Sequence, residues 1–240
     1  MDYRDFQILN SKKNEHFWYK ARRLLVTNLL QSTLKNKNEE RQIIELGCGT
    51  GVQLPLLSQY GTVTGLDIVP ESIAIIKMAG FSGRVFDIEN ESLKNNSAEV
   101  VACFDVLEHL EHDEAALKKI ARALKTQGVF LFSVPAAPWL FGPHDQAASH
   151  FRRYSKKEIK RKINNSGLEL KTINYWNAWL FPIIVPLRLI KRVISSRANS
   201  DTKPLPSFLN NILYQILAAE TKLGLKLPWG LSLYGTAYKK

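Results

Sequence analysis

The feature that most constrains this chain of 240 residues is a glycine-rich turn between two apolar segments. The turn is Glu45-Leu46-Gly47-Cys48-Gly49-Thr50-Gly51, with Ile43 and Ile44 before it and the apolar-periodic segment 52–57 after it. This order predicts a strand, a tight turn and a helix. Glycine allows positive φ and lets a ligand approach the backbone, and the free N–H groups at a helix start favour an anion. The pattern therefore predicts a cradle for a nucleotide-like cofactor.

The spacing of the glycines distinguishes between cofactors. A dinucleotide site has the pattern G-x-G-x-x-G, whereas here the third glycine comes one residue earlier and an acid lies two residues before the first. The heptapeptide resembles motif I of the class I S-adenosylmethionine (SAM) methyltransferases, in particular the type 11/12-like subgroup and the ubiquinone-pathway O-methyltransferases. The resemblance covers about residues 14–175 and the last strand. It implies SAM as cofactor and a Rossmann-like α/β fold with a seven-stranded, mostly parallel sheet. It also implies cofactor contacts from Glu45, Gly47, Cys48, Gly49 and Gly51.

A helix is predicted before the turn, over residues 14–31, because Phe17, Trp18, Leu24 and Leu29 recur at roughly helical spacing. The segment resembles the N-terminal lid helix of the same family. That resemblance implies that Arg22 binds the methionine carboxylate of SAM. The alternative is an amphipathic helix that only packs on the core.

Acidic residues end the predicted second and third strands. Asp67 closes strand 62–67, twenty residues after Gly47, and its carboxylate can accept both hydroxyl hydrogens of a ribose. Asp87 lies near the end of the predicted strand 84–88, and an incidental surface Asp is the alternative at both positions. The resemblance implies that Asp87 binds the adenine amino group and that the next residue lies against the ring. The remaining predicted cofactor contacts are Ile68, Ile88 and Phe104.

A possible metal site follows the predicted strand 100–104. Asp105, Glu108 and His109 have i, i+3 and i+4 spacing and share one face of a helical turn. One imidazole and two carboxylates can bind a divalent ion, and similar spacing occurs in metal-using relatives. Leu-Glu-His also occurs in family members that need no metal. We predict that no metal is required, with Glu108 and His109 as the candidate ligands otherwise, and that Asp105 takes part in catalysis.

A polar and aromatic stretch, 136–153, follows the predicted helix from Asp113 to Lys125 and the predicted strand 129–134. Its Pro-His-Asp and His-Phe-Arg-Arg-Tyr strings resemble those of a bacterial subgroup of the family. Loops past the carboxyl ends of strands bind substrates in open α/β sheets. We predict His144 or His150 as the base. The predicted substrate contacts are Trp139, Asp145, Arg152, Arg153 and Tyr154. The alternative is a loop whose polar groups only satisfy one another.

A long insertion, 177–230, separates the predicted sixth strand, 168–175, from the seventh, 230–238. The net charge of +11 lies almost entirely in the C-terminal part, because 1–148 is near neutral, 149–175 carries +6 and the insertion +5. The apolar run 179–187 contains two prolines and precedes basic residues. It is too short to span a bilayer, which needs ~20 residues, but it can lie in the headgroup region of an anionic membrane. Alternatively, the insertion forms a substrate lid or a dimer face.

We therefore divide the chain into a lid helix (1–40), a SAM-binding core (41–176), a helical insertion (177–230) and a last core strand (231–240). The predicted reaction is direct, in-line O-methylation of an amphipathic or lipid-linked small molecule, such as a quinone precursor or a lipid-carried glycan. The alternatives are a nucleic-acid methyltransferase that uses the basic C-terminal third, and a SAM-binding protein without turnover.

The expected location is the cytoplasm, with peripheral attachment to the inner face of the membrane. Cys48 and Cys103 have no metal-type partner spacing, and the first residues carry no apolar leader. The oligomeric state and the identity of the acceptor stay open.

Overall fold

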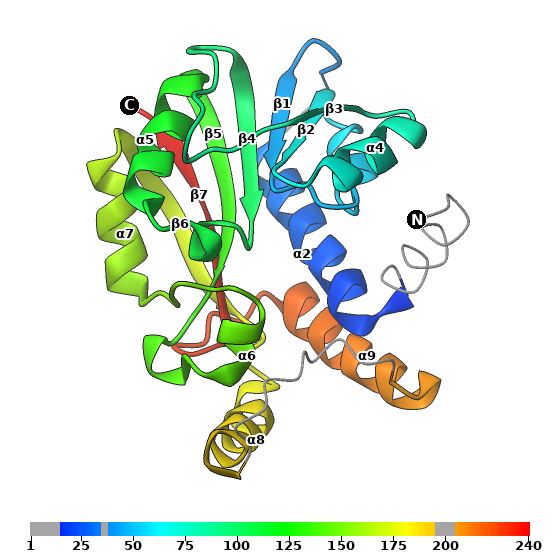
Figure 1. Cartoon of the computed structure of the whole chain (residues 1–240). Helices are drawn as coiled ribbons and strands as arrows, with labels where there is room; N and C mark the ends of the chain where they lie inside the picture. Colours follow the sequence, from blue (N-terminus) through cyan, green and yellow to red (C-terminus); the bar gives the residue numbers. More distant parts are fainter. Residues whose placement is uncertain (1–14, 35–37, 195–204) are drawn as a thin grey trace.

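The computed structural model describes residues 15–34, 38–194 and 205–240, which form one seven-stranded sheet between layers of helices (Figure 1). The strand order is β3-β2-β1-β4-β5-β7-β6. All pairs are parallel except those of β7, which runs antiparallel between β5 and β6. The predicted Rossmann-like α/β fold is confirmed. The strands are β1 Gln42–Leu46, β2 Thr62–Asp67, β3 Ser82–Val85, β4 Ala98–Phe104, β5 Leu124–Pro135, β6 Leu168–Trp176 and β7 Ser232–Lys239.

Helices cover both faces of the sheet because the central parallel strands carry apolar side chains on both sides. One core cluster joins the sheet to α5 and α7 through residues such as Leu117 and Ile159. A second joins the opposite face to α2, α3 and α4 through residues such as Leu30, Leu57 and Ile76. The bounds of these helices are α2 Phe17–Thr33, α3 Leu54–Leu57, α4 Pro70–Met78, α5 Asp113–Ala123 and α7 Lys156–Asn165.

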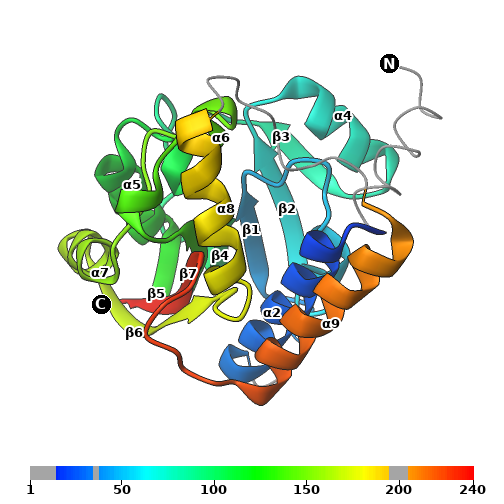
Figure 2. The ribbon, with the colours of Figure 1, turned by 90° about the horizontal axis from the view of Figure 1, so that it is seen from below.

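The predicted insertion is helical and packs on the lid helix. Its helices are α8 (Phe181–Ile194) and α9 (Ser207–Leu223), and α9 lies along α2 (Figure 2). A third apolar cluster joins α2 to the insertion, and it contains Ala21, Leu25, Trp176, Leu180 and Leu217. The buried Glu220 carboxylate accepts hydrogen bonds at 3.0 Å from the amides of Ala178 and Trp179, just before α8. The insertion therefore shares its core with the lid.

Two predicted boundaries before β4 were wrong. The helix after the glycine turn has only four residues, Leu54–Leu57, because Gly51 has φ +79° and Pro55 starts the first turn. β3 covers Ser82–Val85 instead of 84–88, because the Asp87 carboxylate accepts the amide of Glu89 and closes a turn there.

The boundary between α5 and β5 also differs from the prediction. α5 ends at Ala123, and β5 begins at Leu124, which is fully buried and pairs with Ala98. Burial and strand pairing there outweigh the helical pattern that the sequence suggested up to Lys125. The stretch 136–153 is not wholly irregular, since it contains η2 (Pro138–Leu140) and α6 (Pro143–Ala147).

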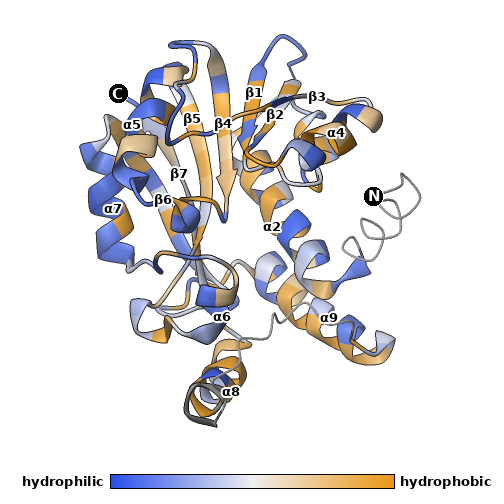
Figure 3. Cartoon of the chain, viewed as in Figure 1, coloured by the Kyte–Doolittle hydropathy of each residue, from blue (hydrophilic) through white to orange (hydrophobic). Residues whose placement is uncertain are grey.

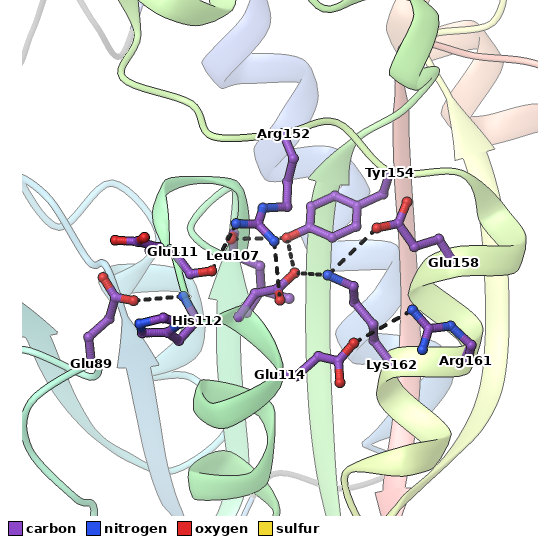
Figure 4. Close-up of polar contacts among 11 residues, drawn as sticks. Glu89, Leu107, Glu111, His112, Glu114, Arg152, Tyr154, Glu158, Arg161 and Lys162 are labelled. Carbon is purple, nitrogen blue, oxygen red and sulfur yellow. Dashed lines mark hydrogen bonds and ion pairs between the residues drawn. The ribbon is translucent and has the colours of Figure 1, made fainter.

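A buried ion pair fixes the loop that follows β5 (Figure 4). Asp113, the first residue of α5, lies 2.6 Å from Lys162 Nζ of α7 and 2.8 Å from the Tyr154 hydroxyl. The same hydroxyl lies 3.0 Å from the carbonyl oxygen of Leu107, at the end of β4. Asp113, Tyr154 and Lys162 are all buried. The network therefore joins α5, α7 and the two loops at the carboxyl edge of the sheet.

We expect Lys162→Met to lower the free energy of unfolding by about 3 kcal/mol, because it removes the nearer cation of a buried carboxylate and leaves only Arg152, 3.6 Å from Asp113. The measurement is equilibrium unfolding in urea. Arg161→Met is the matched control, since Arg161 pairs with Glu114 at 3.6 Å on the surface, where both side chains are about half exposed. Such a pair contributes ~1 kcal/mol or less. Equal losses in the two variants would contradict the role of the buried pair.

Candidate functional site

The glycine turn is shaped for a ligand at one position and for packing at the other two. Gly47, Gly49 and Gly51 all have positive φ, at +64°, +51° and +79°. A Cβ on Gly47 would overlap Val106, and one on Gly51 would lie 2.8 Å from Ile76 Cγ2. A Cβ on Gly49 would meet no described atom within 4 Å. Gly49 therefore borders open space at the carboxyl edge of the sheet.

The turn is tied to the end of β2 by Asp67. One carboxylate oxygen accepts the Gly49 amide at 2.7 Å, and the other accepts the Val69 amide at 2.9 Å. Each oxygen keeps a second lone pair, so the carboxylate can still accept a ribose hydroxyl as predicted. The adjacent Ile68 is 62% exposed, which leaves an apolar side chain beside the turn for a ring.

Two other predicted cofactor contacts are largely engaged by the protein. The Asp87 carboxylate accepts hydrogen bonds from the Asn90 side chain and the Glu89 amide, which lower its pKa. The Ile88 side chain is 7% exposed and belongs to the core cluster that contains Leu117. The predicted adenine contacts of Asp87 and Ile88 stay predictions, and Ile88 has little surface to offer.

The Cys48 thiol is also buried, and burial raises its pKa. Its backbone, however, forms the turn, because the Cys48 carbonyl accepts the amide of Gly51 and its amide donates to Leu66. Any contact between Cys48 and a cofactor would therefore be made by the main chain.

Glu45 is a buried acid directly below the turn. Burial, and secondly the nearby Asp67 carboxylate, raise its pKa to about 8, while Arg22 acts in the opposite direction. One of its carboxyl oxygens has no hydrogen-bond partner among the described residues. A ligand cation would stabilise the ionised form of Glu45. The positive charges of SAM fit this requirement.

Arg22 connects the lid helix to the end of β4. Its guanidinium lies 2.9 Å from the Asp105 carboxylate and 5.8 Å from the centre of the Phe104 ring. Asp105 has φ +53°, and its other oxygen accepts the Ser133 hydroxyl at 2.7 Å. Ser133 was not among the predicted site residues, since a lone Ser inside an apolar strand gives no signal. The arrangement holds α2 over the carboxyl edge, where Arg22 was predicted to bind SAM.

A second buried acid, Glu108, lies at the end of β4 with two histidines. Burial, and then Asp105, raise the pKa of Glu108 well above its usual value. The His109 and His150 rings meet edge to face with centroids 4.6 Å apart. One potential ligand atom from each of Glu108, His109 and His150 lies within 4.8 Å of the others. The candidate metal ligands in the structure are therefore Glu108, His109 and His150, with His150 in place of the predicted Asp105. That no metal is required stays a prediction.

Asp145 organises the loop that carries His150. It accepts hydrogen bonds from Arg153 Nε at 2.8 Å, His150 Nδ1 at 3.1 Å and the Gly142 amide at 3.1 Å. Burial alone would raise the pKa of Asp145, but the hydrogen bonds from His150 and Arg153 lower it. Because the ionised carboxylate accepts a hydrogen bond from Nδ1–H, the lone pair of His150 lies on Nε2 and can accept a proton there.

Several predicted substrate residues belong to this internal network. Asp145, Arg153 and Tyr154 are buried, and Arg153 also donates to the Ala136 carbonyl at 3.0 Å. Arg152 donates to the Glu111 carbonyl at 2.8 Å. These contacts favour the alternative in which the polar groups of the loop satisfy one another.

Two of the exposed side chains of the loop are aromatic. Trp139 and Phe151 are each 55% exposed, and His144 lies part-buried in α6. Phe151 was not predicted as a site residue, although an aromatic between His150 and Arg152 was a usable signal. The open surface of the loop is therefore more apolar than the sequence suggested.

Comparisons with known proteins agree with this geometry. A family model described as a methyltransferase domain matches residues 17–173. A ubiquinone biosynthesis O-methyltransferase of Idiomarina loihiensis is 32% identical over 155 residues, which cover 56% of this chain and 64% of that protein. The match thus spans under two thirds of that relative's length. The family match also ends before α8 and α9.

Solved structures share the fold at low identity. The structure of a SAM-dependent methyltransferase from Mesorhizobium loti has a TM-score of 0.62 at 16% identity and covers 88% of this chain and 95% of its own. Phosphoethanolamine N-methyltransferase 2 of Haemonchus contortus, solved with SAM, has a TM-score of 0.60 at 17% identity. That match covers 88% of this chain and 51% of the other.

We expect Gly49→Val to abolish detectable SAM binding in calorimetry, because the added side chain would fill the open space beside the turn. Gly80→Val is the matched control. Gly80 also has positive φ, at +85°, and a Cβ there would likewise meet no described atom within 4 Å. It should show the same backbone strain without loss of affinity. Equal loss in both variants, or binding of NADH in place of SAM, would contradict the assignment.

We also expect SAM affinity to rise with pH between about 6 and 7.5, by at most about tenfold per unit. Over this range Glu45, with a pKa of about 8, is protonated in the free protein and must lose its proton to attract the cationic cofactor. The amino group of the cofactor, with a pKa of about 8, stays charged. Glu45→Gln should remove this pH dependence in calorimetry, and an unchanged slope would contradict the role of Glu45.

Proposed function

Because the chain belongs to the methyltransferase-domain family and is a SAM-dependent methyltransferase, we propose that it methylates a hydroxyl of an amphipathic or lipid-linked small molecule. Such acceptors include a quinone precursor or a lipid-carried glycan. The observation that carries the proposal is the Asp145–His150 pair in the loop after β5, where His150 lies beside His109. A proton acceptor is needed when the methyl acceptor is a hydroxyl, and the similarity to a named O-methyltransferase supports that class.

In the proposed step one bond forms, one bond breaks and one proton is transferred. SAM supplies an activated methyl group, whose carbon–sulfur bond breaks as the acceptor oxygen bonds to the carbon, and the sulfur keeps the electron pair. The hydroxyl proton passes to Nε2 of His150. Asp145 holds the ring through Nδ1, and the hydrogen bond from Arg153 keeps Asp145 ionised. A base oriented in this way contributes about 10²–10⁴-fold to such a reaction.

The other predicted site residues near the carboxyl edge of the sheet hold the reactants in place and exclude water. Arg22 brings α2 over the glycine turn by its ion pair with Asp105. Glu45 supplies a negative charge below the turn once its proton is lost. Trp139 and Phe151 offer exposed aromatic surface at the loop, on which an apolar part of the acceptor can pack.

The main alternative for His150 is metal ligation together with Glu108 and His109. An ion at that position would use the Nε2 lone pair, so His150 could not serve as the base. The two roles respond differently to chelation. Activity should survive EDTA if His150 is the base and should be lost, then restored by added magnesium or zinc, if it is a ligand.

We expect His150→Gln to reduce methyl transfer by about 10²–10⁴-fold, since the base is removed, and to leave SAM affinity within a few-fold. Asp145→Asn should have a similar effect, because the ring loses its orientation. The assay follows labelled methyl groups from SAM into lipid extracts. The matched control is His112→Gln, a change of an exposed histidine of the neighbouring loop. Parallel losses of turnover and SAM affinity would show that the loop is only structural.

The nucleic-acid alternative rests on the basic stretch 149–175, which carries a net charge of +6. Part of that charge is engaged internally, because Arg153 pairs with Asp145 and Lys162 with Asp113. Methyl transfer into tRNA but not into lipid extracts would replace the proposed acceptor with this alternative. If the chain binds SAM but transfers no methyl group to tRNA or to lipid extracts, the result would support the alternative of a SAM-binding protein without turnover.

A further inference from the structure

The insertion presents two exposed apolar stripes at one end of the molecule. On α8, Ile183, Leu187 and Ile190 are 59%, 54% and 54% exposed. On α9, Phe208, Leu209 and Ile212 are 78%, 41% and 39% exposed. These six residues form what we call the apolar end face. The helices that carry them, α8 and α9, lie at the lower end of the molecule in Figure 1 and are rich in apolar residues (Figure 3).

The exposed stripes are not needed for internal packing. Residues 183, 187 and 190 share one face of a helix by their spacing. The packed sides of the same helices contribute Ile184, Leu213 and Leu217 to the cluster shared with α2. The capping of Ala178 and Trp179 by Glu220 fixes the start of α8. The insertion is thus held in place by one set of side chains while a second set faces outward.

We propose that the apolar end face docks on an anionic lipid bilayer. α8 carries Lys191 and Arg192 directly after Ile190 and contains no acidic residue. Basic residues beside an apolar stripe complement anionic headgroups. A symmetric dimer through the same face would instead bring two copies of this basic cluster together, since a twofold interface pairs a patch with itself. Charge therefore favours the bilayer over a second copy.

The helices are suited to lie in the interface and not to cross it. α8 has 14 residues and a proline at position 186, so it spans about 21 Å, whereas a hydrocarbon core is about 30 Å thick. None of the described helices is long and apolar enough to cross a membrane.

Docking in this way would place the candidate site toward the bilayer. The carboxyl end of β4 and the loop with α6 lie at the same end of the molecule as α8 (Figures 1 and 2). The Trp139 ring of that loop contacts the Phe181 ring of α8 edge to face, with centroids 6.2 Å apart. The surface would then deliver an amphipathic acceptor directly to the site, and this consequence rests on the proposed function.

The test is flotation of the full chain with vesicles of phosphatidylcholine alone or mixed equally with phosphatidylglycerol. Each basic residue near an anionic surface strengthens attachment about fivefold, so Lys191 and Arg192 together should favour the mixed vesicles about twenty-five-fold. Lys191→Gln with Arg192→Gln should remove this preference. High salt should remove it as well, since the Debye length is ~3 Å at 1 M.

Ile183→Asp with Leu187→Asp should abolish flotation on both kinds of vesicle. The matched control is Met78→Asp with Val85→Asp, because these side chains on α4 and β3 are also exposed, at 58% and 44%. The control should float like the original chain. SAM calorimetry verifies that each variant is folded, and it keeps a failure of docking distinct from a failure of the proposed methyl transfer.

Three results would overturn the proposal. The first is flotation that does not depend on lipid charge. The second is a stable dimer in sedimentation that Ile183→Asp with Leu187→Asp converts to monomer, which would assign the face to a second copy. The third is absence of flotation with tight tRNA binding in a gel-shift assay, which would assign the basic insertion to nucleic acid.

Discussion

The site depends on an excess of carboxyl groups at the carboxyl edge of the sheet. Glu45, Asp67 and Asp105 come from the ends of three neighbouring strands, and Glu108 follows directly. Burial raises the pKa of both Glu45 and Glu108. Arg22 is a cation that acts on Glu45, Asp105 and Glu108. A cationic cofactor beside the glycine turn would relieve the same repulsion, so the electrostatics of this edge and the chemistry of SAM agree.

The position of Arg22 depends in turn on the insertion. Ala21 and Leu25, which flank Arg22 on α2, pack against Trp176, Leu180 and Leu217 in one cluster. In a methyltransferase without this insertion, the lid helix would have to find other support. Here α9 lies along α2, and the amide of Phe17 donates to the Asn210 side chain at 2.8 Å. The insertion is therefore part of the cofactor site in a structural sense, although it contributes no predicted cofactor contact.

The sequence predicted well those features that are local. The glycine turn and the strand ending at Asp67 follow from patterns of a few residues. It could not predict which polar side chains also bond to one another, because that depends on contacts between distant elements. Arg153 and Tyr154 were predicted to contact substrate, yet their partners come from α6 and α5. Likewise, the sequence offered both His144 and His150 as the base. We favour His150 because its Nδ1 lies 3.1 Å from the Asp145 carboxylate.

The contact between Trp139 and Phe181 connects these observations. It joins the loop that carries His150 to the helix that carries the apolar end face. An acceptor whose apolar part stayed in a bilayer would need only its hydroxyl group to enter the site. The protein would then need no deep apolar cavity, and the exposed Trp139 and Phe151 would guide the chain of the acceptor at the lipid surface. The exposed aromatics, the Asp145–His150 pair and the basic amphipathic α8 thus have one common explanation in an acceptor that is presented by a membrane.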